Sequence, residues 1–174
     1  MEVTILKLYL EAIRIMRIKN LLDEDFINYK KPALFIGTCE CDFKCFKERN
    51  LPINTCVNYE LSKFNVINIP DKAIVKRYID NIYTESIVIG GMEPFKQFDE
   101  MVKLIKEFRN VTEDDIVIYT GYYEDEIKDE LKILKEFKNI IIKFGRYIPN
   151  DEEIYDECLG IYLSSSNQYA VKIS

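Results

Sequence analysis

The feature that most constrains the fold is a set of short, unbroken apolar runs, each ending at glycine. Residues 86–91 read Ser-Ile-Val-Ile-Gly-Gly, residues 115–121 read Asp-Ile-Val-Ile-Tyr-Thr-Gly, and residues 140–145 read Ile-Ile-Ile-Lys-Phe-Gly. A strand that is buried on both faces, as in a parallel sheet, has such a continuous run instead of an alternating one. We therefore predict three strands of a parallel sheet over these residues.

Helical segments alternate with these strands. Residues 70–82 begin with Pro-Asp, which suits a helix start, and 95–108 and 124–137 are also expected to be helical. In the second of these segments Phe98, Val102 and Ile105 fall on one helical face. This alternation predicts an α/β fold with right-handed crossovers. Because the units are few, we expect an open or partial (β/α) barrel.

The remaining elements complete a single domain. Residues 33–37 and 65–69 are predicted strands, and a last strand is expected over 168–173. Residues 5–22 are apolar but carry Lys and Arg throughout, which predicts an amphipathic helix instead of a signal peptide. We expect one domain over 1–174, with a helix and linker over 1–31 and the core over 33–174. Without an export signal, the expected location is the cytoplasm.

Charge and hydropathy exclude two classes of partner. The formal net charge is −6, whereas a surface that binds nucleic acid is normally basic. No segment offers the roughly 18 uncharged apolar residues that a membrane span needs. We therefore expect neither a nucleic acid nor a membrane as partner.

Residues that carry chemistry follow four of the predicted strands. In chain order they are Cys39, Cys41 and Cys45; Gly90, Gly91, Glu93 and Pro94; Thr120 and Gly121; and Gly145 and Arg146. Parallel sheets bind ligands at the carboxyl ends of their strands. The sequence therefore predicts one shared cleft.

The chain contains no histidine, which removes Ser-His-Asp catalysis, Cys-His catalysis and His-ligated zinc or haem. It contains five cysteines, and a reducing cytosol makes disulfides a poor use for them. Four cysteines, Cys39, Cys41, Cys45 and Cys56, fall within eighteen positions. Such clustering predicts metal ligands. The fifth, Cys158, stands alone and is expected to be a small core residue.

The ordered motifs of the chain resemble the radical S-adenosylmethionine (SAM) superfamily, and more narrowly the activating proteins of anaerobic ribonucleotide reductase. The matches are Cys-Val-Asn at 56–58, Gly-Gly-Met-Glu-Pro at 90–94, Ile-Tyr-Thr-Gly-Tyr at 118–122, Lys-Phe-Gly-Arg-Tyr at 143–147 and Leu-Ser-Ser-Ser-Asn-Gln at 163–168. Together they cover most of the chain from Ala33 onward. The resemblance implies a partial (β/α) barrel of the small radical SAM type.

The resemblance also implies the cofactors and the reaction. Three cysteines would hold a [4Fe-4S] cluster and leave one iron for SAM. An electron from the cluster would cleave SAM to methionine and a 5′-deoxyadenosyl radical. The implied partner is a glycyl-radical enzyme such as anaerobic ribonucleoside-triphosphate reductase, on which this radical installs a glycyl radical. The implied reductant is a flavodoxin or ferredoxin.

The cysteine spacing departs from the C-x3-C-x2-C pattern of that family. Cys41 and Cys45 supply C-x3-C, but position 48 is Glu and the next cysteine is Cys56. We expect Cys56 to be the third ligand, because Cys-Val-Asn resembles the family's Cys-x-Asn and a ten-residue insertion costs little extra loop entropy. Cys39 is the rival third ligand.

The resemblance assigns the other cofactor contacts to Asn58, Gly90, Gly91, Glu93, Thr120, Ser165 and Asn167. Met92 is an additional residue within the family's Gly-Gly-Glu-Pro turn, and Lys143 stands where the family often has an acid. Each contact also has an ordinary explanation: Gly90 and Gly91 suit a tight turn, and small polar side chains often cap turns.

Two other functions remain open. Cys39, Cys41, Cys45 and Cys56 could form a four-thiolate structural zinc site, although paired C-x2-C spacings are absent. Alternatively, the protein could carry an iron–sulfur cluster as a non-catalytic electron-transfer or binding module.

Overall fold

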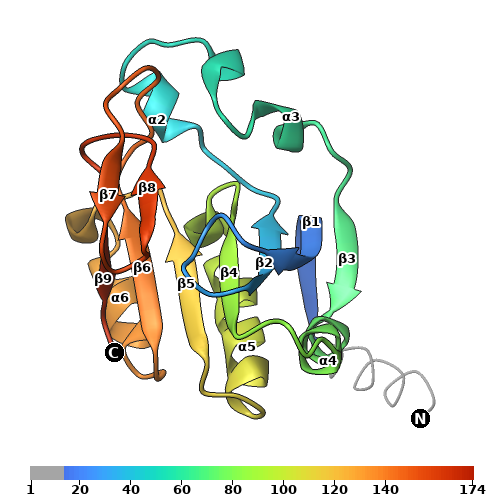
Figure 1. Cartoon of the computed structure of the whole chain (residues 1–174). Coiled ribbons are helices and arrows are strands. Elements are labelled where there is room, and N and C mark those ends of the chain that lie inside the picture. Colours follow the sequence, from blue (N-terminus) through green and yellow to red (C-terminus); the bar gives the residue numbers. More distant parts are fainter. Residues whose placement is uncertain (1–13) are drawn as a thin grey trace.

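The predicted apolar runs form the centre of a seven-stranded sheet (Figure 1). The computed structural model describes residues 14–174. The strands are β1 (Ile15–Asp25), β2 (Ala33–Thr38), β3 (Ile67–Pro70), β4 (Ser86–Gly91), β5 (Asp115–Tyr119), β6 (Ile140–Phe144), β7 (Ile154–Asp156), β8 (Ile161–Leu163) and β9 (Tyr169–Lys172). The helices are α2 (Lys44–Lys47), α3 (Tyr59–Ser62), α4 (Asp71–Asp80), α5 (Phe98–Arg109) and α6 (Lys128–Leu134), with 3₁₀ turns η1 (Ile53–Thr55), η2 (Pro94–Gln97) and η3 (Glu124–Glu126).

The sheet is parallel at its centre and antiparallel at its edges. Its order is β3-β1-β2-β4-β5-β6-β9, and β2, β4, β5 and β6 are parallel neighbours. β1 runs antiparallel to β2 and β3, and β9 runs antiparallel to β6. The α/β class is confirmed, and the expected parallel sheet is found at the centre, whereas both edges are antiparallel.

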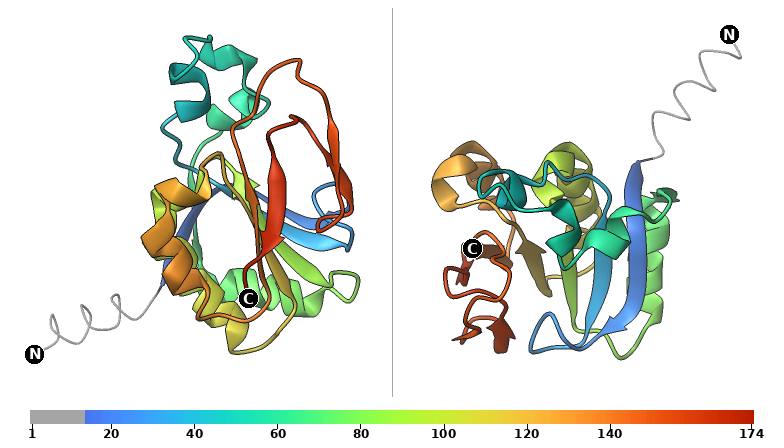
Figure 2. Two further views of the ribbon diagram at one scale, coloured as in Figure 1. Left: turned by 90° about the vertical axis from the view of Figure 1, so that its left-hand side faces the viewer. Right: turned by 90° about the horizontal axis from the view of Figure 1, so that it is seen from above.

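Both faces of the central strands are buried, which explains their continuous apolar runs. Ile87 and Ile89 pack into a core with residues of α4, α5 and α6, whereas Val88 between them packs into a second core with Leu159 and Leu163. Strands β5 and β6 alternate in the same way. Figure 2 shows the two layers, with α4–α6 on one side of the sheet and the β7–β8 hairpin on the other.

The predicted helix over 5–22 is wrong where the structure describes it, because residues 15–25 form strand β1. Met16 and Ile18 are fully buried, while Arg17 between them is partly exposed and pairs with Glu100. This two-residue alternation is that of a strand with one covered face. The linker expected through Lys31 is likewise strand up to residue 25, and the earlier part of the expected helix lies outside the described residues.

The other expected elements are confirmed with shifted ends. The strands over 33–37, 86–91, 115–121 and 140–145 are β2, β4, β5 and β6. The helix expected over 124–137 is shorter, since residues 124–126 form a 3₁₀ turn and α6 ends at Leu134. The β7–β8 hairpin has no counterpart in the expected elements. No helix in the described part of the chain is long and apolar enough to cross a membrane.

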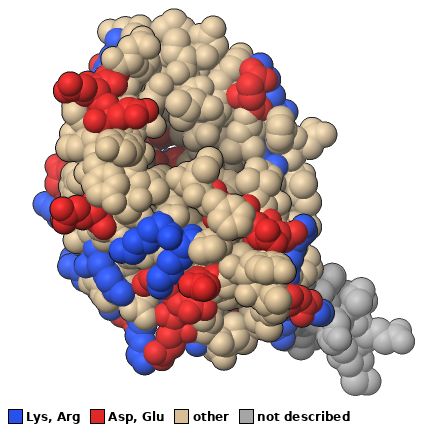
Figure 3. All heavy atoms as spheres, in the orientation of Figure 1, with Lys and Arg blue, Asp and Glu red and all other residues tan. Residues whose placement is uncertain are grey.

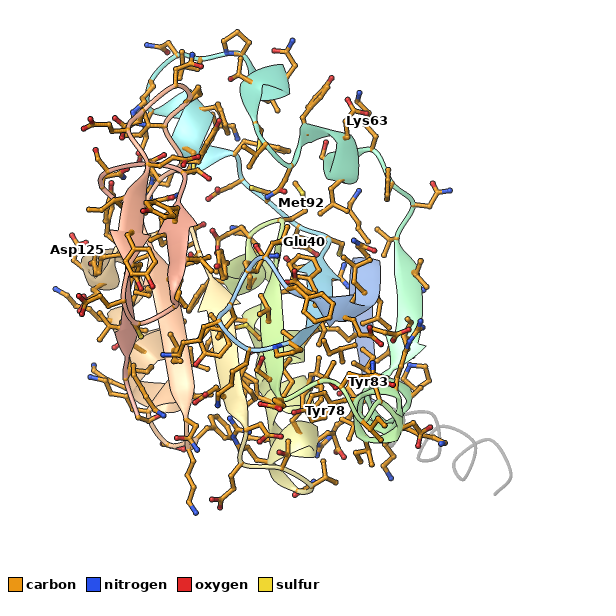
Figure 4. All side chains as sticks on the ribbon, viewed as in Figure 1. Glu40, Lys63, Tyr78, Tyr83, Met92 and Asp125 are labelled. Carbon is orange, nitrogen blue, oxygen red and sulfur yellow. The ribbon has the colours of Figure 1, made fainter. Side chains whose placement is uncertain are left out.

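A short insertion covers the carboxyl ends of the parallel strands. It consists of α2, η1 and α3, and we call residues 44–62 the cap. Figure 1 places the cap above the ends of β2, β4, β5 and β6. Met92 and Glu40 lie at this end of the sheet, whereas Tyr78 and Tyr83 lie at the opposite end (Figure 4). The fold therefore brings the segment that contains Cys41, Cys45 and Cys56 to the same end of the sheet as the Gly-Gly turn at residues 90–91.

At that opposite end, the first residue of α4 is a buried carboxylate. Asp71 is 1% exposed, and neither of its oxygens has a hydrogen-bond partner among residues 14–174. Burial, and then the charges of Glu107 and Glu100, raise its pKa from 3.8 to about 6. A carboxylate without partners favours its neutral form in such a place.

We predict that Asp71→Asn stabilises the fold at neutral pH. The pKa of Asp71 is higher in the folded protein than in the unfolded chain, so proton binding favours the folded state. This contribution to the free energy of unfolding is complete below pH 3.8 and is lost as the pH rises through about 6. The expected gain at pH 8 is about 3 kcal/mol in the free energy of unfolding, falling toward zero near pH 4. Denaturant unfolding of both proteins across this range measures it, and a pH-independent difference would contradict the prediction.

Candidate metal and cofactor site

A cavity of about 480 Å³ lies beneath the cap at the carboxyl ends of the parallel strands. Its walls come from the segment after β2, the cap, the ends of β4, β5 and β6, and β8. Figure 3 shows an opening on this face with a rim of mostly uncharged residues. The volume lies within the usual range of small-molecule and cofactor sites, roughly 300–1,000 Å³.

Three cysteines line this cavity: Cys41, Cys45 and Cys56. Cys41 lies in the turn before α2, Cys45 lies within α2, and Cys56 follows η1. Each sulfur accepts a backbone N–H, from Phe43 at 3.3 Å for Cys41, from Asn58 at 3.4 Å for Cys56, and from Tyr147 for Cys45. Hydrogen bonds of this kind favour the thiolate, which is the form that binds metal.

The three thiols lie close enough to influence one another. Burial raises the pKa of Cys41 to about 12, and the charge of Cys45 contributes to that rise. Burial also raises the pKa of Cys56, again with a contribution from Cys45. Burial thus favours the protonated thiols, whereas a bound metal group would favour the thiolates.

Cys39 does not line the cavity. Its backbone N–H donates to Gln97 Oε1 at 2.5 Å, and the charges of Arg17 and Glu40 act on its thiol. Burial raises the pKa of this thiol as well. The structure thus separates Cys39 from the other three cysteines of the cluster.

Glu48, at the position where the family pattern has its third cysteine, points to a different partner. Its carboxylate pairs with Arg146 at 3.1 Å, and this ion pair lowers the pKa of Glu48. Arg146 is 4% exposed, pairs also with Glu126 at 2.7 Å, and donates to the carbonyl of Gly121. Glu48 therefore joins the cap to the ends of β5 and β6 and does not line the cavity.

Gly121 forms the point of closest approach between the sheet and the cysteines. A Cβ atom on this residue would lie 2.9 Å from Cys45 Sγ and 3.5 Å from Glu93 Oε2. A side chain there would displace the thiol. Gly121, which ends the apolar run over 115–121, thus leaves room for the thiol of Cys45.

Glu93 is the buried anchor of the cavity floor. It is 5% exposed, and its carboxylate accepts from Thr120 Oγ1 at 2.8 Å and from the N–H of Gly121 at 2.9 Å. Burial raises its pKa to about 7 in spite of these bonds. The additional residue Met92 leaves Glu93 in the cavity wall and lines the cavity itself. A buried carboxylate here is suited to receiving a cationic group.

The cap is attached to the Gly-Gly turn. Asn58 Nδ2 donates to the carbonyl of Gly91 at 2.5 Å, and both residues line the cavity. Gly91 has φ of +82°, and an added Cβ would lie 3.0 Å from both Gly37 and Leu61. Glycine is required here by backbone conformation and by the close approach of the cap.

Three predicted contact residues do not line the cavity. Gly90 backs onto Tyr119 and Phe35. Ser165 is fully buried and bonds both the N–H and the carbonyl of Ile148, which is a structural use of its hydroxyl. Asn167 donates to Tyr123 and to the carbonyl of Arg146. Thr120 lines the cavity, as do Ser164 and Gln168, the neighbours of the latter two.

Lys143 also lines the cavity, although we did not expect a contact there. It is 6% exposed, and burial lowers its pKa to about 8. The sequence contained a signal for it, because a single lysine interrupts the otherwise apolar run of β6. A charge inside a strand with two buried faces is costly unless the site uses it.

Three cysteines line the cavity, one fewer than the four protein ligands of a structural zinc site. Among residues 14–174, no three Cys, Asp or Glu side chains surround a point that one metal ion could occupy. A structural zinc needs four ligands at about 2.3 Å for sulfur, whereas each thiolate of an iron–sulfur cubane binds a different iron. Three thiols around one cavity match the second geometry. No fourth cysteine of the described chain lines the cavity.

The comparisons with known proteins address the same region. A family model described as a 4Fe-4S single cluster domain matches residues 33–169, a span that contains the parallel sheet, the cap and the cavity. No curated protein matches the chain, and no solved structure matches it. The matched span covers well over half of the sequence, from β2 to the start of β9. The chain is a member of the 4Fe-4S single cluster domain family.

Proposed function

We propose that the protein is a radical SAM enzyme in which Cys41, Cys45 and Cys56 hold the [4Fe-4S] cluster. One observation carries the proposal: these three thiols and the buried carboxylate of Glu93 line the same cavity. Three ligands leave one iron of a cubane without a protein ligand, which is the iron that SAM would bind. On this proposal the curved sheet is a partial (β/α) barrel within a single domain, and the cytoplasmic location stays a prediction.

The residues of the chain would position SAM and exclude water. Glu93, fixed by Thr120 and Gly121, offers a carboxylate toward the amino group of SAM. Gly91 offers exposed backbone beside it, and Thr120 lies at the end of β5 next to the same cavity. When bound, the reduced cluster supplies the electron that cleaves SAM to methionine and a 5′-deoxyadenosyl radical. Gly90, Ser165 and Asn167 support this wall from behind.

The rim of the cavity favours a macromolecular substrate. Ile27, Val57 and Tyr162 all border the cavity and are 77%, 62% and 67% exposed. Exposed apolar side chains around one opening are typical of a surface that binds another protein. We infer that a glycine loop of a glycyl-radical enzyme, such as anaerobic ribonucleoside-triphosphate reductase, enters here. The radical would take one hydrogen atom from the glycine Cα, giving 5′-deoxyadenosine and a glycyl radical.

Anaerobic reconstitution followed by iron and sulfide analysis tests the ligand assignment. We expect about four irons per chain in the wild type, as for one cubane. Cys41→Ala, Cys45→Ala and Cys56→Ala should lose the cluster, whereas Cys39→Ala and the control Cys158→Ala should keep it. Loss in Cys39→Ala but not in Cys56→Ala would replace the third ligand, and a colourless protein with one zinc would refute the iron–sulfur site.

Cleavage of SAM tests the enzymatic reaction. We expect the reduced, reconstituted protein to release 5′-deoxyadenosine and methionine in equal amounts, and Cys45→Ala to release neither. Glu93→Gln should weaken SAM binding by at least tenfold, because it removes the charge that faces the amino group. A protein that holds a full cluster but releases no 5′-deoxyadenosine would instead be an electron-transfer module.

The rim can be tested separately from the chemistry. We expect Ile27→Lys and Tyr162→Lys to lower the yield of glycyl radical on the partner at least fivefold in electron paramagnetic resonance spectra. Cleavage of SAM without the partner should be unchanged. Ile82→Lys is the matched control, since Ile82 is 84% exposed and does not border the cavity. Equal radical yields in all three variants would exclude the rim as the docking surface.

A further inference from the structure

Lys143 is a buried cation whose charge no ion pair offsets within the described part of the chain. It is the fourth residue of β6, opposite Tyr119 on β5. The one hydrogen bond of its ammonium group within the described chain is to the carbonyl of Gly145, at a long 3.4 Å. Its Nζ lies 5.7 Å from the centre of the Tyr119 ring. These weak contacts repay little of the cost of taking an ammonium group out of water.

The charges that do face Lys143 belong to the site. Cys45 and Glu93 both favour its protonated form. Conversely, the charge of Lys143 is among the influences that lower the pKa of Cys45, against the larger effect of burial. The ammonium group, the thiol and the carboxylate all line the same cavity.

The second cation near Cys45 is already neutralised. Arg146 also lowers the pKa of Cys45, but its guanidinium forms ion pairs with Glu48 and Glu126. Lys143 forms no such pair within residues 14–174. Its positive charge is therefore available to a group that binds in the cavity, and it favours a negatively charged group there.

We propose that Lys143 is the counter-charge of the iron–sulfur cluster and makes the cluster easier to reduce. This inference rests on the proposed cluster site at Cys41, Cys45 and Cys56. Three thiolates give the assembly a negative charge, and reduction adds one electron and thus one more negative charge. A buried cation beside the cluster stabilises the reduced state more than the oxidised one. Lys143 is thus a positioning residue that acts through the cluster.

The test measures the midpoint potential of the holoprotein by dye-mediated titration with dithionite at pH 7, monitored by electron paramagnetic resonance. The proteins are the wild type, Lys143→Met, Lys143→Arg and Lys135→Met. Lys135 is exposed at the end of α6, so its variant removes the same charge outside the cavity. We expect Lys143→Met to lower the equilibrium constant for reduction at least tenfold, which is about 59 mV for a one-electron couple. Lys143→Arg and Lys135→Met should stay within threefold of the wild type.

The iron content separates the possible failures. A wild type without iron refutes the proposed function itself, before any variant is compared. A full cluster with an unchanged potential in Lys143→Met overturns the counter-charge. Loss of the cluster from Lys143→Met with retention in Lys143→Arg supports it, since the positive charge is then needed to hold the anionic cluster. Loss from both variants overturns it, because the site would then require the shape of lysine and not its charge.

Discussion

The site depends on one buried carboxylate that joins three strand ends. Glu93 follows β4, and its side chain accepts hydrogen bonds from Thr120 and Gly121 at the end of β5. Its backbone N–H donates to the carbonyl of Glu40, in the segment after β2, at 2.7 Å. The side chain and main chain of Glu93 thus hold together three segments: the Gly-Gly turn, the segment after β2 that leads to Cys41, and the end of β5 with Gly121. Burial raises the pKa of Glu93 because the fold places it in the floor of the cavity.

The parts of the fold that were predictable are those where burial is two-sided. Strands β4, β5 and β6 contribute side chains to both cores, so their sequences are apolar without interruption and are recognised at once. β1 contains as many apolar residues, but its charges at Arg17 and Lys19 resemble the polar face of a helix. The alternation of buried and exposed residues in β1 is evident only in the structure, where residues of the helical layer cover Met16 and Ile18. The β7–β8 hairpin is too short to carry a period.

The site was predictable to the extent that it follows from strand ends. Cys41, Cys45, Glu93 and Thr120 line the cavity because parallel strands deliver their carboxyl ends to one edge. Pairings across the chain were not predictable, since Glu48 with Arg146 joins residues 98 positions apart. In the C-terminal motif, the side chains that line the cavity are one residue away from the expected ones. Ser164 and Gln168 therefore line the cavity where Ser165 and Asn167 were expected.

The attachment of the cap determines what a search for related chains should look for. Residues 51–55 are all exposed, and Cys56 is located from its downstream side, where Asn58 bonds the carbonyl of Gly91. Upstream, the backbone N–H of Cys56 also donates to the carbonyl of Ile53 at 3.0 Å, but exposed loop residues tolerate insertions and deletions better than buried contacts do. A signature defined by the number of residues between cysteines would overlook chains with such changes. One defined by the Cys-x-Asn pair together with the Gly-Gly turn that it contacts would find them.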